Sequence, residues 1–431
     1  MVGNGGPSTE VLGAIARDFG TPCFVYFMDE VRARVAAVRS AFGNRFRISY
    51  AVKSNPNPAV LRRMRGLVDL LDVSSAGEVA LAVTAGWSPR DLSFTGPGKT
   101  CAELQVAVEA GVGEVILESI DEAEQLNSIA AGLSQRQAVL IRIAPSRLPR
   151  GFGVNMSGKP SQFGVDEEVV DAAVKAVVSL PHLELAGFHI YSGTQCLKAE
   201  AIVENYENFI GIFRRVCDAH GLRPRTLVFG SGIGIPYYDS DLPVDLPALG
   251  AMIAPALDGL KSAPSFAAAE LVLETGRYLV GEAGVYVTRV IRTKHSRGTD
   301  IAICDGGMHH HLGAAGHLGS VVQRNYRMFK IAPEQHEGTE RPYDVVGPLC
   351  TTIDTLGRRV KFNGLAAGDL IGIACSGAYG VTASPIHFIS HVPPKEIMVE
   401  TAHGQLTLED CSQFEGREAR AERRRPAAEY V

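Results

Sequence analysis

Short apolar runs alternate with amphipathic stretches between about residues 45 and 280 of this chain. Between the runs lie helical patterns such as "AGEVALAVTAG" and "IDEAEQLNSIAAGL". Strand-then-helix alternation is typical of parallel βαβ units, and eight such units in roughly 240 residues predict a (β/α)8 barrel. Periodicity alone leaves an open doubly wound sheet as the alternative. The eight runs are "FRISYAVK", "VDLLDVSS", "DLSFTG", "EVILES", "AVLIRIA", "LAGFHIY", "TLVFGSG" and "AELVLETG".

The pattern changes after about residue 282. Pieces such as "AGVYVTRVIRTK", "TDIAICDGG", "DLIGIACSGAY" and "KEIMVE" are rich in β-formers and are separated by turn residues. They predict a second, mostly β domain, and the N-terminal segment ending near "FVYFMDE" is expected to pair with it. We therefore divide the α/β chain into a barrel over 27–282 and a β domain from 1–26 plus 283–405. The charge-dense segment 406–431 is expected to be a disordered tail.

Composition and charge narrow the class of protein. The 431 residues are 46% hydrophobic and 21% charged, and the net charge of -5 gives no general attraction to nucleic acid or to an anionic membrane. No apolar run approaches the roughly 18 residues of a membrane span, and the opening "MVGNGGPSTE" lacks the pattern of a secretory signal. Eight scattered cysteines without CxxC pairing argue against a zinc site and a disulfide framework. A reducing compartment, the cytoplasm, is expected.

Polar residues at strand ends are the first candidates for chemistry, because barrel enzymes place function there. Lys53 closes the first apolar strand in "ISYAVKSNPNP". Its amine either reaches water at the barrel rim, or is a nucleophile that forms a Schiff base. The last two strands end in "FGSGIGIPY", with Gly230, Gly232 and Gly234, and in "LETGRYLV". Closely spaced glycines suit an anion, and Glu274 and Arg277 either pair with each other or bind a ligand.

The β-rich part carries further candidates. Cys350 follows a Gly-Pro turn in "GPLCTTIDTL", and Tyr379 lies in "SGAYG", as a phosphate ligand or as a core side chain. Three consecutive histidines, His309 to His311, cannot face one metal ion from a regular element, so no metal site is expected.

Taken together, these residues give the chain a family resemblance. It resembles the fold type III pyridoxal-phosphate decarboxylases, the group of diaminopimelate, ornithine and arginine decarboxylases, over nearly its whole length. The motifs "YAVKSNPNPAVL", "DVSSAGEVALA", "SQFGVD", "GSGIGIPY", "ETGR", "DGGMHHHL", "GPLC" and "GAYG" occur in the family's order.

The resemblance implies a role for each matching residue. Lys53 would bind pyridoxal 5'-phosphate covalently and release it to the substrate amine. Glu274 would face the pyridine nitrogen and keep it protonated, which favours decarboxylation over racemisation. Cys350 would protonate Cα, reaching across a head-to-tail homodimer with shared active sites. The substrate side would involve His189, Thr351 and Asp354. The other cofactor contacts would be Tyr191, Thr194, Gly230, Ser231, Gly232, Gly276, Arg277 and Tyr379.

Three departures from the family pattern bear on the substrate. "HIYSGT" places Tyr191 where a ring-stacking histidine is expected, and the Arg-Pro…Tyr stretch after "DGG" is missing. Thr351 stands where diaminopimelate and ornithine enzymes carry a carboxylate for the distal ammonium. The loss of that charge-assisted contact is worth roughly 1.5–3 kcal/mol. The pattern looks more like the branch that decarboxylates acidic aminoacyl groups tethered to an acyl or peptidyl carrier protein.

Two other functions stay open at this point. One is a decarboxylase of a free amino acid such as diaminopimelate, ornithine or lysine. The other is a catalytically silent homologue that binds a partner, although such homologues tend to lose the lysine or the cysteine. Arg324, Arg327 and Lys330 in "QRNYRMFK" either meet an acidic carrier protein or form a solvated basic face.

Overall fold

The computed structural model describes residues 8–318, 324–331 and 339–414, and these form two compact units. The barrel unit comprises Arg32–Pro236 and Asp241–Leu279. The β unit comprises the described residues of 1–31, 237–240 and 280–431. The short segment Tyr237–Ser240, which the sequence places inside the barrel, thus groups with the β unit.

The barrel unit is a closed parallel sheet whose strands follow chain order. The last strand pairs with the first, with Glu274 opposite Ser49, so the open doubly wound alternative is wrong and the (β/α)8 prediction is confirmed. The strands in ring order are β2 (Arg47–Ala51), β3 (Leu70–Val73), β4 (Leu92–Phe94), β5 (Glu114–Leu117), β6 (Gln137–Ala144), β9 (Leu183–Ile190), β11 (Thr226–Gly230) and β12 (Glu270–Thr275). Three short strands add to this unit: β8 (Val165–Asp166) beside β6, and β7 (Val154–Asn155) paired with β10 (Gly193–Thr194).

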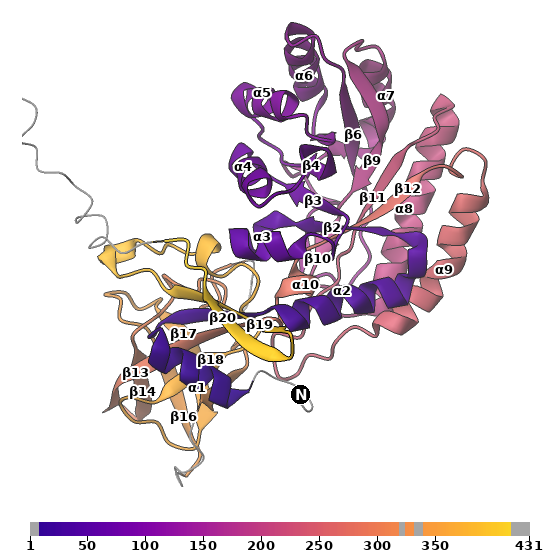
Figure 1. Cartoon of the computed structure of the whole chain (residues 1–431). Coiled ribbons are helices and arrows are strands. Elements are labelled where there is room, and N and C mark those ends of the chain that lie inside the picture. Colours follow the sequence, from indigo (N-terminus) through magenta and orange to yellow (C-terminus); the bar gives the residue numbers. More distant parts are fainter. Residues whose placement is uncertain (1–7, 319–323, 332–338, 415–431) are drawn as a thin grey trace, which may run out of the picture. The chain divides into compact units, whose positions relative to one another are not determined.

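Helices cover the outside of the ring, as Figure 1 shows for α4 to α7 around β3, β4, β6 and β9. Several begin at a side chain that caps the free backbone N–H groups of the first turn. Ser75 accepts from Glu78 N, and Thr100 and Glu103 form a capping box. The helices are α2 (Met28–Phe42), α3 (Pro58–Met64), α4 (Ala76–Thr84), α5 (Cys101–Ala110), α6 (Ile120–Gly132), α7 (Val170–Val178), α8 (Ala199–His220), α9 (Leu246–Ser262) and α10 (Arg277–Val280).

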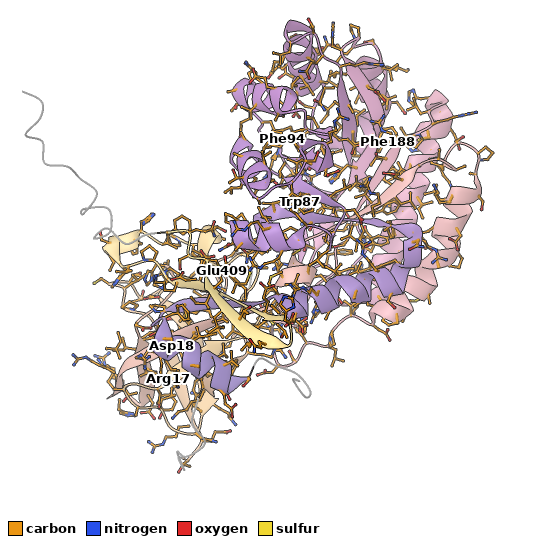
Figure 2. The ribbon with its side chains drawn as sticks, in the orientation of Figure 1. Arg17, Asp18, Trp87, Phe94, Phe188 and Glu409 are labelled. Carbon is orange, nitrogen blue, oxygen red and sulfur yellow. The ribbon has the colours of Figure 1, made fainter. Side chains whose placement is uncertain are left out.

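Apolar packing separates the barrel's core from its polar strand ends. One buried cluster draws one residue from each of five strands: Ile116, Leu140, Ala186, Val228 and Val272. A second layer lies between sheet and helices, where Phe188 (labelled in Figure 2) stacks on Phe213 of α8 at 6.4 Å between ring centroids. With these faces filled, the charged side chains at the carboxyl ends of the strands are the ones left to bind a ligand.

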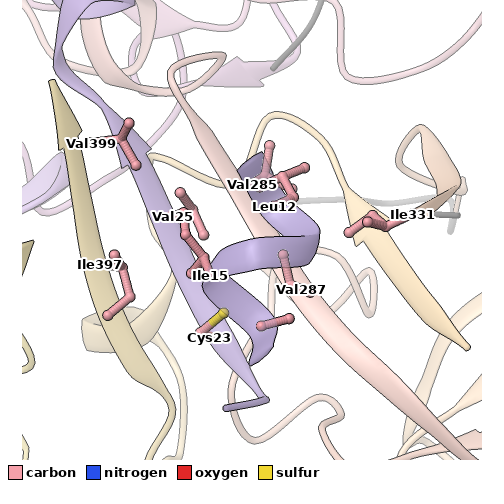
Figure 3. Packing of buried hydrophobic residues seen from close by; sticks show 10 residues of the cluster. Leu12, Ile15, Cys23, Val25, Val285, Val287, Ile331, Ile397 and Val399 are labelled. Carbon is pink, nitrogen blue, oxygen red and sulfur yellow. The ribbon is translucent and has the colours of Figure 1, made fainter. Parts of the chain in front are cut away.

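The β unit is built on one mixed sheet. The N-terminal strand β1 (Cys23–Phe27) lies between β13 (Gly284–Ser296), antiparallel, and β19 (Lys395–Ala402), parallel, which is the pairing expected for this segment. Figure 3 shows the core beneath it, in which α1 (Thr9–Asp18) packs Leu12 and Ile15 against Val25 and Val287. The other strands are β14 (Thr299–Cys304), β15 (Met328–Ile331), β16 (Arg341–Val346), β17 (Thr355–Phe362), β18 (Leu370–Ile373) and β20 (Gln405–Asp410).

The expected tail needs a correction. Residues 406–410 were expected to be disordered, but they lie in β20, which pairs antiparallel with β19 from Ala402↔Gln405 to Ile397↔Asp410. The exposed leucines Leu406 and Leu408 show that little apolar burial holds this strand, so its backbone ladder to β19 does. The rest of the expected tail, 415–431, lies outside the described residues.

Over the described ranges, no helix is both long enough and apolar enough to cross a bilayer.

Candidate functional site

Lys53 lies at the carboxyl end of β2, in a 3-10 turn over Val52–Ser54. Its Nζ donates to Oδ2 of Asp72 at 2.8 Å and lies 3.8 Å from Oε1 of Glu274. Asp72 and Glu274 are 2% and 3% exposed at their side chains, whereas the Lys53 side chain is 39% exposed. An amine held between two buried carboxylates and still open to solvent is well placed to react with a ligand.

Glu274 is held ionised by its surroundings. Its Oε2 lies 2.8 Å from Nε2 of His189, which comes from β9 and is itself buried. Burial by itself would raise the pKa of Glu274, but the charge of Lys53, the His189 hydrogen bond and the charge of Arg142 lower that pKa well below its ordinary value. The structure thus provides a fixed negative charge at the end of β12. His189, expected on the substrate side, lies against Glu274, and its contact with substrate stays a prediction.

Asp72, on β3, is a site residue that the sequence reasoning missed. Its Oδ1 accepts from Thr95 Oγ1 at 2.5 Å, while Oδ2 faces Lys53. Burial and the nearby charge of Glu274 raise the pKa of Asp72, against the opposing effect of Lys53. A carboxylate inside the apolar run "VDLLDVSS" was the signal available, because a buried acid needs a partner.

The glycines after β11 and β12 lie where side chains do not fit. A Cβ on Gly230 would overlap the ring of Tyr191, and one on Gly276 would lie 2.8 Å from Ser54 Oγ. Gly232 has a φ of +65°, in the left-handed region that favours glycine. Ser231 N donates to Glu274 O at 2.8 Å, so this glycine turn is fastened to the end of β12. Backbone packed this closely can approach an anion such as a phosphate.

The remaining expected cofactor contacts of the barrel unit lie around the same ends of the strands. Tyr191 follows β9, Thr194 ends β10, and Arg277 begins α10 directly after Gly276. An open amine, a buried anion for a cationic ring nitrogen, and a glycine turn for a phosphate fit pyridoxal 5'-phosphate. Lys53 would hold its aldehyde carbon, Glu274 its ring nitrogen, and Gly230 to Gly232 with Gly276 and Arg277 its phosphate.

In the β unit, Cys350 is exposed on the segment 347–354. Asp354, by contrast, is 3% exposed, and its two carboxylate oxygens accept from Met308 N at 2.7 Å and Leu349 N at 2.8 Å. A Cβ on Gly347 would overlap this carboxylate. Asp354 therefore fixes the backbone on either side of Cys350, a role that the sequence did not indicate. Its expected contact with substrate, like that of Thr351, stays a prediction.

Tyr379 is held in an unusual backbone conformation, with a φ of +54°. Two residues earlier, a Cβ on Gly377 would overlap the carbonyl oxygen of Val280. A non-glycine residue in the left-handed region costs energy and persists where neighbouring packing imposes it. The backbone thus fixes the direction of the Tyr379 side chain; its contact with phosphate stays a prediction.

The three consecutive histidines, His309 to His311, are buried in the β unit. His310 contacts Tyr286 Oη and Val392 O, His311 contacts Ser376 Oγ, and neither ring nitrogen of His309 has a hydrogen-bond partner. Burial lowers their pKa values to about 4 for His309 and about 3 for His310 and His311. Among the described residues, no group of three or more His, Cys, Asp or Glu side chains is arranged to hold a metal ion.

These pKa values predict that the protein loses stability in mild acid. Below about pH 6.5 a histidine of the unfolded chain takes up a proton, while the buried histidine stays neutral. The free energy of unfolding therefore decreases as the pH is lowered from about 6.5 toward 3–4. At pH 5 each histidine should contribute about 2 kcal/mol of lost stability. Urea unfolding at pH 7 and pH 5 measures the effect, and His309→Phe should remove roughly a third of the histidine share. An unchanged difference between the two pH values in that variant would contradict the assignment.

The basic residues of "QRNYRMFK" are engaged within the β unit. Arg324 lies 3.8 Å from the ring centroid of Tyr238 and donates to Ser240 Oγ, and Lys330 pairs with Asp369 at 2.7 Å. Arg327 donates to Cys375 Sγ and lies 3.8 Å from Glu282. Each of the three residues thus has a partner inside the β unit, and their contact with a carrier protein stays a prediction.

Comparisons with known proteins identify relatives of this chain. A family described as "Pyridoxal-dependent decarboxylase, pyridoxal binding domain" matches residues 28–281. An L-glutamyl-[BtrI acyl-carrier protein] decarboxylase of Niallia circulans is 34% identical over 91% of this chain and 92% of that protein. A diaminopimelate decarboxylase of Zymomonas mobilis is 31% identical over 86% of each chain.

Solved structures show the same two-part fold. Diaminopimelate decarboxylase from Helicobacter pylori complexed with L-lysine superposes with a TM-score of 0.83 at 26% identity, covering 95% of this chain and 99% of that one. SrLDC in complex with PLP and cadaverine superposes with a TM-score of 0.78 at 25% identity, covering 92% and 95%. The chain therefore belongs to the fold type III pyridoxal-phosphate-dependent amino-acid decarboxylases, the family of the ornithine, arginine and diaminopimelate enzymes.

Proposed function

We propose that this decarboxylase acts on an acidic aminoacyl group, of glutamyl, aspartyl or methylaspartyl type, tethered to an acyl-carrier protein. The main support for this proposal comes from the residues of segment 347–354. Its single carboxylate, Asp354, is buried and bonded to Met308 N and Leu349 N, and Thr351 stands directly after Cys350. In this proposal the segment faces the distal end of the substrate with hydroxyls and without an exposed carboxylate. A thioester suits that surface, whereas a distal ammonium does not.

The residues divide the work of the reaction as follows. Bound pyridoxal 5'-phosphate supplies an electron sink for the pair left at Cα when CO2 departs. Glu274 is held ionised by Lys53 and His189, and it would stabilise a positive charge at the ring nitrogen. Lys53 would hold the cofactor and exchange it for the substrate amine, and Cys350 would supply the proton that replaces CO2 at Cα.

Two further parts of the proposal concern assembly and location. A head-to-tail homodimer would bring Cys350 of one copy to the barrel of the other. None of the eight cysteines forms a disulfide in the structure, which suits a reducing compartment such as the cytoplasm.

The substrate panel that tests this proposal measures CO2 release from L-glutamyl-[BtrI acyl-carrier protein] and from free glutamate, diaminopimelate, ornithine and lysine. We expect kcat/KM on the tethered substrate to exceed that on every free amino acid by about tenfold or more, since a missing charge-assisted contact has that effect. Thr351→Glu, which restores a carboxylate, should improve turnover of a free diamino acid, with Thr351→Gln as its uncharged control. Efficient turnover of free diaminopimelate by the native protein would instead favour the second candidate function.

A further inference from the structure

The loop 145–164 after β6, here called the rim loop, carries Arg147, Arg150 and Lys159 and contains no aspartate or glutamate. All three cations are exposed. A fourth exposed cation, Lys198, lies beside the loop, because a Cβ on Gly151 would be 3.7 Å from Lys198 Cδ. The rim loop and Lys198 therefore form one basic surface of the barrel unit.

This surface borders the site. The rim loop pairs with the segment after β9: Gly153 N donates to Thr194 O at 3.0 Å, and Met156 N donates to Ser192 O at 2.8 Å. Phe152 reaches the glycine turn, where a Cβ on Gly232 would lie 2.6 Å from its ring. The basic surface thus stands at the carboxyl ends of the barrel strands, next to the residues that would hold the phosphate.

The loop is held in shape by its own backbone. Gly158 N donates to Pro145 O at 3.1 Å, so the two legs of the loop are closed at the base and Lys159 is brought toward the Arg147 side. Asn208 of α8 donates to Arg147 O at 3.4 Å. The three cationic residues of the rim loop therefore extend from a backbone that is held by hydrogen bonds.

Within the described part of the chain, none of the four cations has a carboxylate oxygen within 4.0 Å. The nearest acid along the chain that touches the loop, Glu167, accepts from Ser146 N and Oγ and lies 3.5 Å from Arg215. Lys198 also occupies the N-cap of α8, where a cation opposes the helix dipole at a cost of about 0.3–1 kcal/mol. No ion pair within the described chain therefore competes with a partner for these four cations.

We infer that the basic surface of Arg147, Arg150, Lys159 and Lys198 docks an acidic acyl-carrier protein. This inference rests on the proposed function, since it names the surface on which the tethered substrate arrives. A substrate on a flexible arm must enter at the carboxyl ends of the strands, so its carrier has to rest on the rim beside them. The phosphodiester at the base of the arm and the acidic face of the carrier both complement the four cations.

The test compares two double variants that change net charge equally. Arg147→Glu/Arg150→Glu alters the rim loop, and Arg90→Glu/Arg223→Glu alters exposed arginines that precede β4 and β11, at the opposite ends of the strands. For L-glutamyl-[BtrI acyl-carrier protein] we expect the rim double variant to raise KM about tenfold or more, because charged clefts change encounter rates by that order. Its kcat should stay near the native value, and the gap should narrow as salt is added.

L-glutamyl-pantetheine, which has the thioester but neither carrier nor phosphodiester, separates docking from chemistry. The rim double variant should process it like the native protein, and the control double variant should match the native protein on both substrates. Equal KM values of the two double variants on the carrier would overturn the docking inference while leaving the proposed function intact. A native protein that ignores tethered glutamate and decarboxylates free amino acids would overturn both.

Discussion

Replacing Lys53 with alanine should abolish decarboxylation and the covalent attachment of the cofactor together. The Lys53 amine is the open nucleophile at the carboxyl end of β2, and Asp72 and Glu274 hold it in place. Loss of a covalent catalytic group typically lowers kcat by about a thousandfold or more. The measurement is CO2 release, combined with borohydride reduction and mass analysis of the peptide that contains residue 53.

Lys53→Arg is the matched control for charge. Lys53→Arg keeps a cation beside Asp72 and Glu274. Lys53→Ala removes that cation from the two buried carboxylates, and its loss raises the pKa values of both and destabilises the fold. We expect Lys53→Arg to fold nearly as well as the native protein and still to lack activity, since a guanidinium does not replace the amine. A cofactor still attached covalently to the barrel unit of Lys53→Ala would refute the assignment.

The second large effect is expected from Glu274→Gln. This change keeps the shape of a side chain that is 3% exposed but removes the negative charge at the end of β12. Without that charge a protonated ring nitrogen loses its partner, and we expect kcat to fall by about a hundredfold to a thousandfold. Glu274→Asp, which keeps the charge but shortens the side chain, should lose less.

The pH profile provides an independent check on Glu274. Because Lys53 and His189 lower its pKa despite burial, Glu274 is ionised throughout the neutral and mildly acidic range. A plot of the native kcat against pH should therefore show no rise or fall caused by titration of Glu274 between pH 5 and 8. A Glu274→Gln variant with native kcat, or a rise or fall of the native kcat that this variant removes, would contradict the role given to Glu274.

The contrast between Asp354 and Asp72 shows where sequence reasoning reached its limit. Motif order placed Asp354 near the reaction, which stays a prediction, but it did not indicate that the carboxylate accepts from Met308 N and Leu349 N. Asp72 lay inside an apolar run and was passed over, yet it contacts Lys53 at 2.8 Å. The partners of a buried acid come from strands or loops far away in the chain, and one-dimensional patterns do not contain them.

The alternation of apolar and amphipathic segments was enough to predict the eight barrel strands, because strand and helix periods are local properties of the chain. Residue type and position at strand ends were likewise enough to single out Lys53, Glu274 and the glycine turn. The tertiary structure alone decided that Lys53 lies between two buried carboxylates, that His189 contacts Glu274, and that Lys198 lies beside the rim loop. Charge state and access depend on burial and on neighbours from distant segments, and these exist only once the sheet has closed.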